Sequence, residues 1–313
     1  MYFIGIDLGG TNISVGITDE TGNILKKLST PTKADRHHSE IIKDMAVVCQ
    51  NLIDDLAISQ NDVKSIGIGC PGKLDPKNKK AIYVNNINFR DVSFKDEFAK
   101  YFDIPIFLQN DANCAALGEY IAGACKGYKN SLTITLGTGV GGGIIIDGKI
   151  YSGSFYLGGE IGHIVIEHKG RRCTCGRSGC FEAYASASAL TKRSRELASE
   201  NTNSKLFKAV DGDVEKIDPK LVFELSKSGD DFCKAIVDEY IEYLAEGLTD
   251  LINIFDPEII AIGGGISAQD DYLIKPLTKL IERDVYGGKL NAKIVKASLG
   301  NNAGIVGSAM LGK

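Results

Sequence analysis

The chain has 313 residues, 43% of them hydrophobic and 24% charged, with a formal net charge of −4. This composition is ordinary for a folded protein, and the length allows two domains with substantial cores. The acidic balance gives no electrostatic reason to expect nucleic-acid binding. No apolar stretch approaches the ~20 residues of a membrane span, so we expect no membrane association. The eight cysteines and the lack of a signal-like opening segment favour a reduced, cytoplasmic location.

The first third of the chain predicts a β-hairpin followed by alternating helices and strands. Residues 2–7 form a short apolar strand, Gly9-Gly10-Thr11 turns the chain, and residues 13–18 return as a second strand. The elements expected next are a helix over 41–56, a strand over 65–69 and a strand over 104–108 that ends at Asn110-Asp111. A helix starting near Asn113 and running to about Ala122 should follow.

A second hairpin with the same pattern begins near residue 132. Residues 132–136 form its first strand, Gly137-Thr138-Gly139 its turn and residues 144–148 its second strand. Leu8 aligns with Leu136, Gly9 with Gly137 and Asp19 with Asp147. This weak internal repeat suggests two domains built on one plan.

The last part of the chain predicts a long helix and a buried strand. Apolar residues at helical spacing run over 235–255 and stop before Pro257. Residues 258–262 then form a strand that leads into Gly263-Gly264-Gly265. Strands that alternate with helices along the whole chain indicate an α/β fold.

The glycine turns favour phosphate binding, because glycine lets phosphate oxygens approach backbone N–H groups without a Cβ in the way. Asp7, at a strand end, could hold Mg²⁺ through water. For a single hairpin, an ordinary β-turn with an aspartate cap is the alternative. The candidate nucleotide-binding residues are Asp7, Gly9, Gly10, Thr11, Asn12, Gly137, Thr138, Gly139, Gly263, Gly264 and Gly265.

Two other nucleotide motifs are rejected. Residues 137–142 satisfy G-x-G-x-x-G, and residues 143–149 resemble a Walker A loop, although Ile150 stands where Ser or Thr is required. Both motifs need a helix to follow, so that its N-terminus meets the phosphates. The apolar run at 144–146 predicts a strand instead.

His163, Cys173, Cys175 and Cys180 have the spacing of a zinc site, H-x9-C-x-C-x4-C. Three thiolates and one imidazole complete a closed tetrahedral shell, which is the structural kind of zinc site and leaves no position for a catalytic water. Gly176 and Gly179 suit the tight turns of such a loop. The alternative is three reduced thiols and an ordinary histidine.

These segments together resemble the ROK family of sugar kinases, in particular its glucokinase-like members. The resemblance runs from Asp7-Leu8-Gly9-Gly10-Thr11 to Gly263-Gly264-Gly265 and is most specific in Glu160-x-Gly162-His163 and in residues 173–182, CTCGRSGCFE. It implies an actin-like (ribonuclease H-like) ATPase fold, with two α/β domains around a central cleft. We expect a smaller domain of residues 1–118 and 300–313, and a larger domain of residues 119–299 with the zinc loop.

The resemblance also implies the roles of the site residues. Asp111 is the general base, and Asn110 beside it holds a sugar hydroxyl, although either could also cap the following helix. Phe89 stands where the family has Trp in its N-L-x-W segment, which makes Asn86 the matching asparagine. The residues expected to bind the sugar are Asn86, Asn110, Glu160, His163 and Glu182. His163 then serves both zinc and sugar, one with each ring nitrogen.

The function implied is ATP-dependent phosphorylation of the 6-hydroxyl of a hexose, with glucose as the leading substrate, Mg²⁺ and ATP as cofactors and a homodimer as the expected assembly. The alternatives within this class are kinases for an N-acetylhexosamine, mannose, fructose or a β-glucoside. A sugar-responsive repressor is a more distant alternative, since its helix-turn-helix would have to precede the first hairpin, where six residues stand before Asp7. A zinc-organised interaction module without catalysis is the third.

Overall fold

The computed structural model describes residues 1–84 and 86–313, which form two compact units. Unit 1 comprises residues 1–133, 142–159 and 297–313, and unit 2 comprises residues 134–141 and 160–296. The domain bounds expected from the sequence, at 118/119 and 299/300, stay a prediction. No helix in the described part of the chain combines the length and the apolar character needed to cross a membrane.

The elements alternate between strands and helices, as the sequence indicates. The strands are β1 (Tyr2–Leu8), β2 (Asn12–Thr18), β3 (Ile24–Pro31), β4 (Val63–Cys70), β5 (Lys73–Asp75), β6 (Lys80–Val84), β7 (Phe89–Ser93), β8 (Ile106–Asn110), β9 (Ser131–Leu136), β10 (Val140–Ile146), β11 (Lys149–Ile150), β12 (Ile259–Gly263) and β13 (Lys293–Lys296). The α-helices are α1 (His38–Asp55), α2 (Phe94–Phe98), α3 (Asp111–Ala122), α4 (Glu182–Ala185), α5 (Ala187–Glu200), α6 (Lys205–Ala209), α7 (Pro219–Lys227), α8 (Asp231–Phe255), α9 (Asp271–Asp284) and α10 (Ala303–Met310). Short 3-10 turns are η1 (Gln60–Asp62), η2 (Ile161–His163), η3 (Val214–Lys216), η4 (Gly265–Gln269) and η5 (Gly300–Asn302).

The main sheet of unit 1 has the strand order β3-β2-β1-β4-β8. β1 to β3 form an antiparallel meander, whereas β1, β4 and β8 run parallel. The central strands are almost wholly buried, while the edge strand β3 alternates between partly buried and exposed residues, as expected for a strand with one solvated face. The carboxyl ends of three parallel strands therefore meet at one edge of this sheet.

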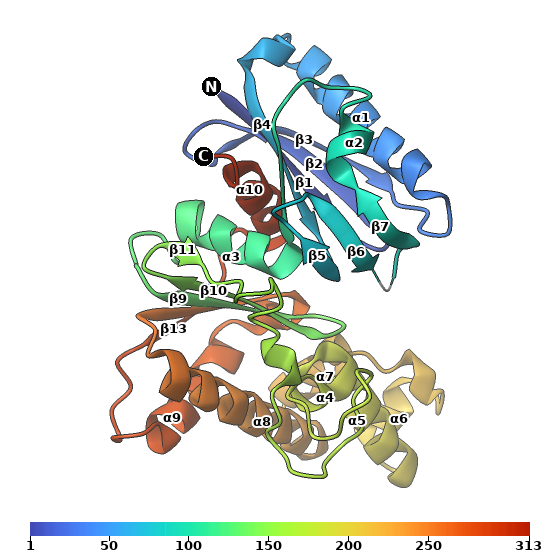
Figure 1. The fold of residues 1–313 in the computed structure, drawn as a ribbon. Helices are drawn as coiled ribbons and strands as arrows, with labels where there is room; N and C mark the ends of the chain where they lie inside the picture. Colours follow the sequence, from blue (N-terminus) through green and yellow to red (C-terminus); the bar gives the residue numbers. More distant parts are fainter. Residues whose placement is uncertain (85) are drawn as a thin grey trace. The chain divides into compact units, whose positions relative to one another are not determined.

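Glycine lets α10 pack against the backbone of this sheet (Figure 1). A Cβ on Gly5 of β1 would lie 2.0 Å from the Ile305 carbonyl oxygen, and one on Gly67 of β4 would lie 1.7 Å from that of Ser308. Neither position could hold a side chain without moving the helix. α10 is consequently seated directly on β1 and β4.

The second five-stranded sheet repeats the order of the first, β11-β10-β9-β12-β13. Its three hairpin-connected strands correspond to β3-β2-β1, and β12 and β13 form a parallel pair, as β4 and β8 do. This agreement is what the weak sequence repeat predicts. β10 follows the glycine turn directly, which confirms that neither of the rejected nucleotide motifs has its helix.

Unit 2 is largely helical around α8, whose apolar positions are buried at helical spacing. α8 begins at Asp231, four residues before the predicted start, because the Asp230 carboxylate accepts the Cys233 N–H at 2.8 Å as an N-cap. It ends at Phe255, where Asp256 adopts a left-handed conformation with φ 42° and Pro257 follows. β8 begins two residues later than predicted, since Pro105 lacks the N–H donor that a strand needs.

Candidate functional site

Asp7 and Asp111 lie at the same edge of the unit 1 sheet. In the register of the sheet, Asp7 pairs with Gly69, and Cys70 at the end of β4 pairs with Asn110 at the end of β8. Asp111 follows as the first residue of α3. The parallel strands thus bring together two carboxylates that are 104 residues apart in the sequence.

Both carboxyl groups have raised pKa values. Burial, and to a smaller extent the negative charge of Asp111, raises the pKa of Asp7 to about 6. Burial also raises the pKa of Asp111, against hydrogen bonds from the Ala112 N–H, its own N–H and the Asn110 side chain. A carboxyl group with a raised pKa beside a second acidic group is suited to accept a proton or to attract a divalent cation.

Asn110 caps α3, as the sequence analysis allowed. Its Oδ1 accepts the Ala112 N–H at 2.9 Å and the Asn113 N–H at 3.3 Å. This cap fixes the first turn of the helix and with it the Asp111 backbone. The cap and a role in substrate binding are compatible, because the cap uses only the carbonyl oxygen of the side chain.

The first glycine turn, at Gly9 and Gly10, is tied to its surroundings by three hydrogen bonds. The Gly9 N–H bonds the Asn12 carbonyl at 3.0 Å, the Thr32 hydroxyl bonds the Gly9 carbonyl at 2.6 Å, and the Thr32 N–H bonds the Thr11 carbonyl at 2.8 Å. Asn86 is exposed and lies beside this turn, since a Cβ on Gly10 would be 3.1 Å from its Nδ2. The structure therefore brings together Asn86 and the first turn.

The second glycine turn lies against the Gly263–Gly265 segment in unit 2. Gly264 has φ +81°, and a Cβ there would be 2.3 Å from the Leu136 carbonyl oxygen, directly before Gly137. The turn is closed by the Gly137 N–H, which bonds the Gly139 carbonyl at 3.0 Å. Two of the three predicted glycine segments are thus neighbours.

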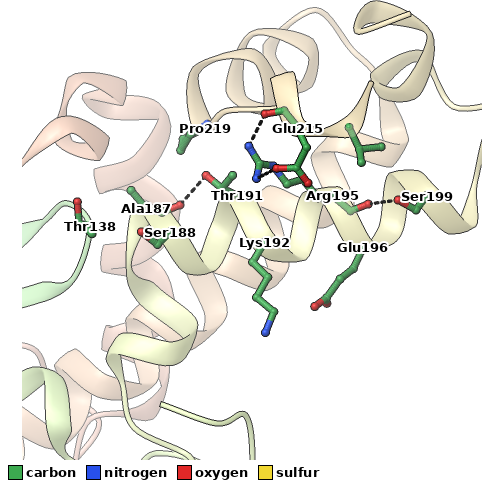
Figure 2. Close-up of a pocket in the computed structure, with 11 residues that line it drawn as sticks. Thr138, Ala187, Ser188, Thr191, Lys192, Arg195, Glu196, Ser199, Glu215 and Pro219 are labelled. Atoms are coloured by element: carbon green, nitrogen blue, oxygen red, sulfur yellow. Dashed lines mark hydrogen bonds and ion pairs between the residues drawn. The ribbon is translucent and has the colours of Figure 1, made fainter. Parts of the chain in front are cut away.

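Beside this turn lies a cavity of about 610 Å³ that the sequence analysis did not predict (Figure 2). Its wall is formed by Thr138, by α5 with Thr191, Lys192, Arg195 and Glu196, and by residues of η3 and the start of α7. Arg195 is held by Glu215, with an Nη1–Oε2 distance of 2.5 Å, while its Nε is buried without a partner among the described residues. The only sequence signal for this wall is the run of charged residues at helical spacing in α5.

The four predicted metal ligands converge in unit 2. Their ligand atoms lie within 4.8 Å of one another, with His163 Nδ1 3.8 Å from Cys173 Sγ and Cys175 Sγ 3.6 Å from Cys180 Sγ. A tetrahedron with Zn–S bonds of about 2.3 Å has edges of about 3.8 Å, so these distances fit a zinc ion. Gly176 and Gly179 both have positive φ, +93° and +81°, as the turns of the loop require.

Glu182 links the metal cluster to the second glycine turn. Its Oε2 accepts the Val140 N–H at 3.0 Å, and its Oε1 lies 3.8 Å from Cys173 Sγ and 3.5 Å from Thr174 Oγ1. Glu160 is exposed at the start of η2, where its carbonyl accepts the His163 N–H at 3.0 Å. Of the predicted sugar-binding residues, Asn86 and Asn110 therefore belong to unit 1, and Glu160, His163 and Glu182 to unit 2.

Known proteins resemble the chain over nearly its whole length. The model of the ROK family matches residues 3–313. The glucokinase of Thermotoga maritima is 36% identical over 313 residues, which cover 99% of this chain and 97% of that protein. The structure of a ROK family glucokinase from Streptomyces griseus in complex with glucose and AMPPNP has a TM-score of 0.82 at 34% identity and covers 99% of both chains. The ROK hexokinase of Thermus thermophilus has a TM-score of 0.84 at 29% identity, covering 99% of this chain and 97% of the other.

Proposed function

Because the chain belongs to the ROK family and has its actin-like ATPase fold, we propose that it is an ATP-dependent kinase that phosphorylates the 6-hydroxyl of glucose. The resemblance to glucokinases extends over the whole chain, and one of them has been solved with glucose and an ATP analogue. Within the structure, the observation that carries the proposal is the pair of carboxyl groups, Asp7 and Asp111, at the edge where three parallel strands end.

Asp111 acts as the general base in this proposal. Its carboxylate accepts the proton of the sugar 6-hydroxyl while that oxygen forms a bond to the γ-phosphorus of ATP, and the bond from the γ-phosphorus to the β–γ bridging oxygen breaks to release ADP. Burial raises the pKa of Asp111, which makes it a stronger base than an ordinary exposed carboxylate. Mg²⁺, held through Asp7, would neutralise the charge of the phosphates.

The sugar would be bound by side chains that donate and accept hydrogen bonds in fixed directions. These are Asn86, Asn110, Glu160, His163 and Glu182. The phosphates of ATP would bind the glycine segments, and the nucleoside end would occupy the cavity between Thr138 and α5. The proposal keeps the nucleotide-binding residues that the sequence predicts, which are Asp7, Gly9, Gly10, Thr11, Asn12, Gly137, Thr138, Gly139, Gly263, Gly264 and Gly265.

We also propose that zinc occupies the cluster of His163, Cys173, Cys175 and Cys180 and orders its loop. With Nδ1 turned toward Cys173, the other ring nitrogen of His163 is left to meet the sugar. The chain would work in the cytoplasm, where ATP is available and its thiols stay reduced, and we expect a homodimer.

A panel of sugars in an assay of ADP formation tests the proposed function. Glucose should support turnover, whereas 6-deoxyglucose, which lacks the accepting hydroxyl, should not. N-acetylglucosamine, mannose, fructose and a β-glucoside test the alternative sugars directly. A rate that is the same with every sugar and without sugar would reject the kinase proposal.

Asp111→Asn tests the base. The variant should lose roughly 10²–10⁴-fold in kcat, because the amide cannot accept the proton, while its affinity for glucose changes little. Asp103→Asn is the control, since Asp103 is an exposed carboxylate on the same unit. Equal kcat values for Asp111→Asn and the unmodified protein would remove Asp111 from the mechanism.

A further inference from the structure

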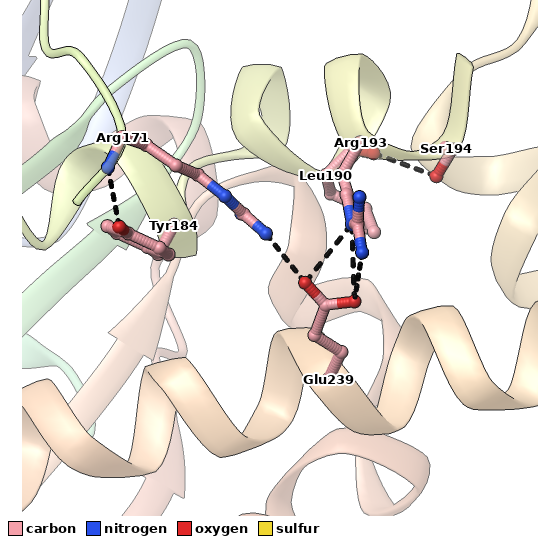
Figure 3. Close-up of polar contacts among 6 residues, drawn as sticks. All are labelled: Arg171, Tyr184, Leu190, Arg193, Ser194 and Glu239. Carbon is pink, nitrogen blue, oxygen red and sulfur yellow. Dashed lines mark hydrogen bonds and ion pairs between the residues drawn. The ribbon is translucent and has the colours of Figure 1, made fainter. Parts of the chain in front are cut away.

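Glu239, near the middle of α8, joins two arginines from different parts of unit 2 (Figure 3). Its Oε1 lies 2.6 Å from Arg171 Nη2, and its two oxygens lie 3.2 Å from Arg193 Nε and Nη2. Arg171 belongs to the loop that carries the metal ligands, and Arg193 belongs to α5. All three side chains are about one-third exposed, so solvent only partly screens the ion pairs.

Arg171 is tied to the metal loop by its backbone and to two tyrosine rings by its side chain. Its N–H donates to the Tyr184 hydroxyl at 2.6 Å, and its carbonyl accepts the Gly179 N–H at 2.8 Å. Its guanidinium lies 4.5 Å from the centre of the Tyr184 ring and 5.2 Å from that of Tyr243. The position of this guanidinium therefore depends on how well the segment between His163 and Cys180 is ordered.

Arg193 connects α5 to Glu239 in the way that Arg171 connects the metal loop to it. Its neighbours Lys192 and Arg195 line the cavity (Figure 2), while Arg193 turns to Glu239. Since a helix moves as a stiff rod, the contact that holds Arg193 also sets the position of the cavity wall. Glu239 thus holds the metal loop and the wall of the cavity with one carboxylate.

The charges make Glu239 the essential member of the three. Two guanidinium groups that share one carboxylate would repel each other without it. Loss of either arginine leaves an ion pair intact, whereas loss of Glu239 removes both. Asp238 offers a comparison on the same helix, because its carboxylate pairs with Lys234 at 2.5 Å on an exposed surface.

From these contacts we propose that Glu239 is a positioning residue that couples order in the zinc loop to nucleotide binding in the cavity beside α5. The proposal rests on the proposed function in that zinc and ATP are the two ligands. By linkage, whatever zinc adds to the affinity for nucleotide, nucleotide adds to the affinity for zinc.

The test measures the Kd for AMPPNP before and after zinc is removed with a chelator, in the unmodified protein, Glu239→Gln and Asp238→Asn. Zinc removal should raise the Kd by at least about fivefold in the unmodified protein and in Asp238→Asn, but by less than about twofold in Glu239→Gln. The zinc-loaded Glu239→Gln protein should already show a raised Kd and a raised KM for ATP with little change in kcat. Circular dichroism on the same samples verifies that they stay folded.

The coupling would be overturned if zinc removal changed the Kd for AMPPNP equally in Glu239→Gln and in the unmodified protein. It would also be overturned if zinc removal left the Kd of the unmodified protein unchanged. If the chelated protein unfolds, the zinc-loaded variants decide: Arg171→Gln and Glu239→Gln should each raise the Kd, and the double variant should add little more. Fully additive effects would reject the coupling. No AMPPNP binding by the zinc-loaded, unmodified protein would instead refute the proposed function.

Discussion

Glu119, near the end of α3, should be the most costly single carboxylate to remove from unit 1. Its side chain is fully buried, and its two oxygens accept four hydrogen bonds. Oε2 accepts from the Ala124 N–H at 2.7 Å, the Ser298 N–H at 3.1 Å and the Ser298 hydroxyl at 3.3 Å, and Oε1 accepts from the Leu299 N–H at 2.8 Å. One carboxylate therefore ties the end of α3 to the segment that leads into α10.

The loss of stability expected on removing Glu119 follows from these four donors. A hydrogen bond to a charged group contributes about 1.5–3 kcal/mol, but burial of the carboxylate offsets much of the sum. Glu119→Ala leaves the donors without an acceptor and should cost about 3–5 kcal/mol, as for other broken buried charge networks. Glu119→Gln keeps one acceptor oxygen and should cost about 2 kcal/mol.

Hydrogen exchange is the suitable assay, because denaturant curves of a chain with two units need not be two-state. The amides of Ala124 and Leu299 should exchange about 10²-fold faster or more in Glu119→Ala. Glu224→Gln is the matched control, since Glu224 forms an exposed pair with Lys220 and should change little. Unchanged exchange at Ala124 and Leu299 in Glu119→Ala would refute the reasoning.

Three further predictions concern the carboxylates and the metal cluster. Because the pKa of Asp7 is about 6 in the folded protein and 3.8 as a free side chain, the metal-free protein should lose stability as the pH rises from about 4 to 6. The loss due to Asp7 should reach about 3 kcal/mol (6 − 3.8 = 2.2 units). In a pH series of thermal melts, Asp7→Asn should reduce this loss to the part that the raised pKa of Asp111 contributes, and it should also weaken Mg²⁺-dependent ATP binding. The kcat of the enzyme should fall on the acid side at a pH above the ordinary carboxyl range, since burial raises the pKa of Asp111 and the base must be ionised. If the residual activity of Asp111→Asn falls at the same pH, the titrating group is not Asp111. Cys180→Ser should reduce bound zinc from about one ion per chain to nearly none and lower the melting temperature, whereas Cys125→Ser should keep the metal; equal zinc contents by elemental analysis would contradict the assignment of the cluster.

The sequence predicts the fold well where a local pattern decides the structure. The first hairpin, α1, α3 and β12 lie close to their predicted bounds, because apolar periodicity and glycine turns act over a few residues. β10 and α8 each begin four residues before their predicted starts at 144 and 235, although α8 ends at the predicted residue before Pro257. The metal cluster can be predicted for the same reason, since its four ligands lie within eighteen residues of the sequence and their spacing is typical of a zinc site. The hairpin repeat also holds at the level of the sheets, which share one strand order.

Contacts between distant segments could not be read from the sequence. The cavity beside α5 forms only when Thr138 meets residues from 187 to 219. Glu182 was expected to face a sugar, a role that stays a prediction, and the structure adds an acceptor role toward the Val140 N–H. The shared carboxylate of Glu239 likewise joins Arg171 to Arg193 across 68 and 46 residues, a separation at which no periodicity gives a signal.

The two copies of the repeat differ in charge at the ends of their strands. The alignment that pairs Leu8 with Leu136 places Thr135 opposite Asp7, so the second copy has a neutral residue where the first has a carboxylate. β4 ends at Cys70, whereas its counterpart β12 ends at Gly263 and leads into Gly264 and Gly265. The first edge therefore concentrates negative charge, which suits a cation and a base. The strand ends of the second edge carry no carboxylate, which suits phosphate oxygens, and the one carboxylate described at its glycine turn, that of Glu182, is bonded to the Val140 N–H. If this difference matters, Thr135→Asp should weaken AMPPNP binding by adding a second carboxylate near the turn that Glu182 already contacts. An unchanged Kd would show that the two edges do not differ in this way.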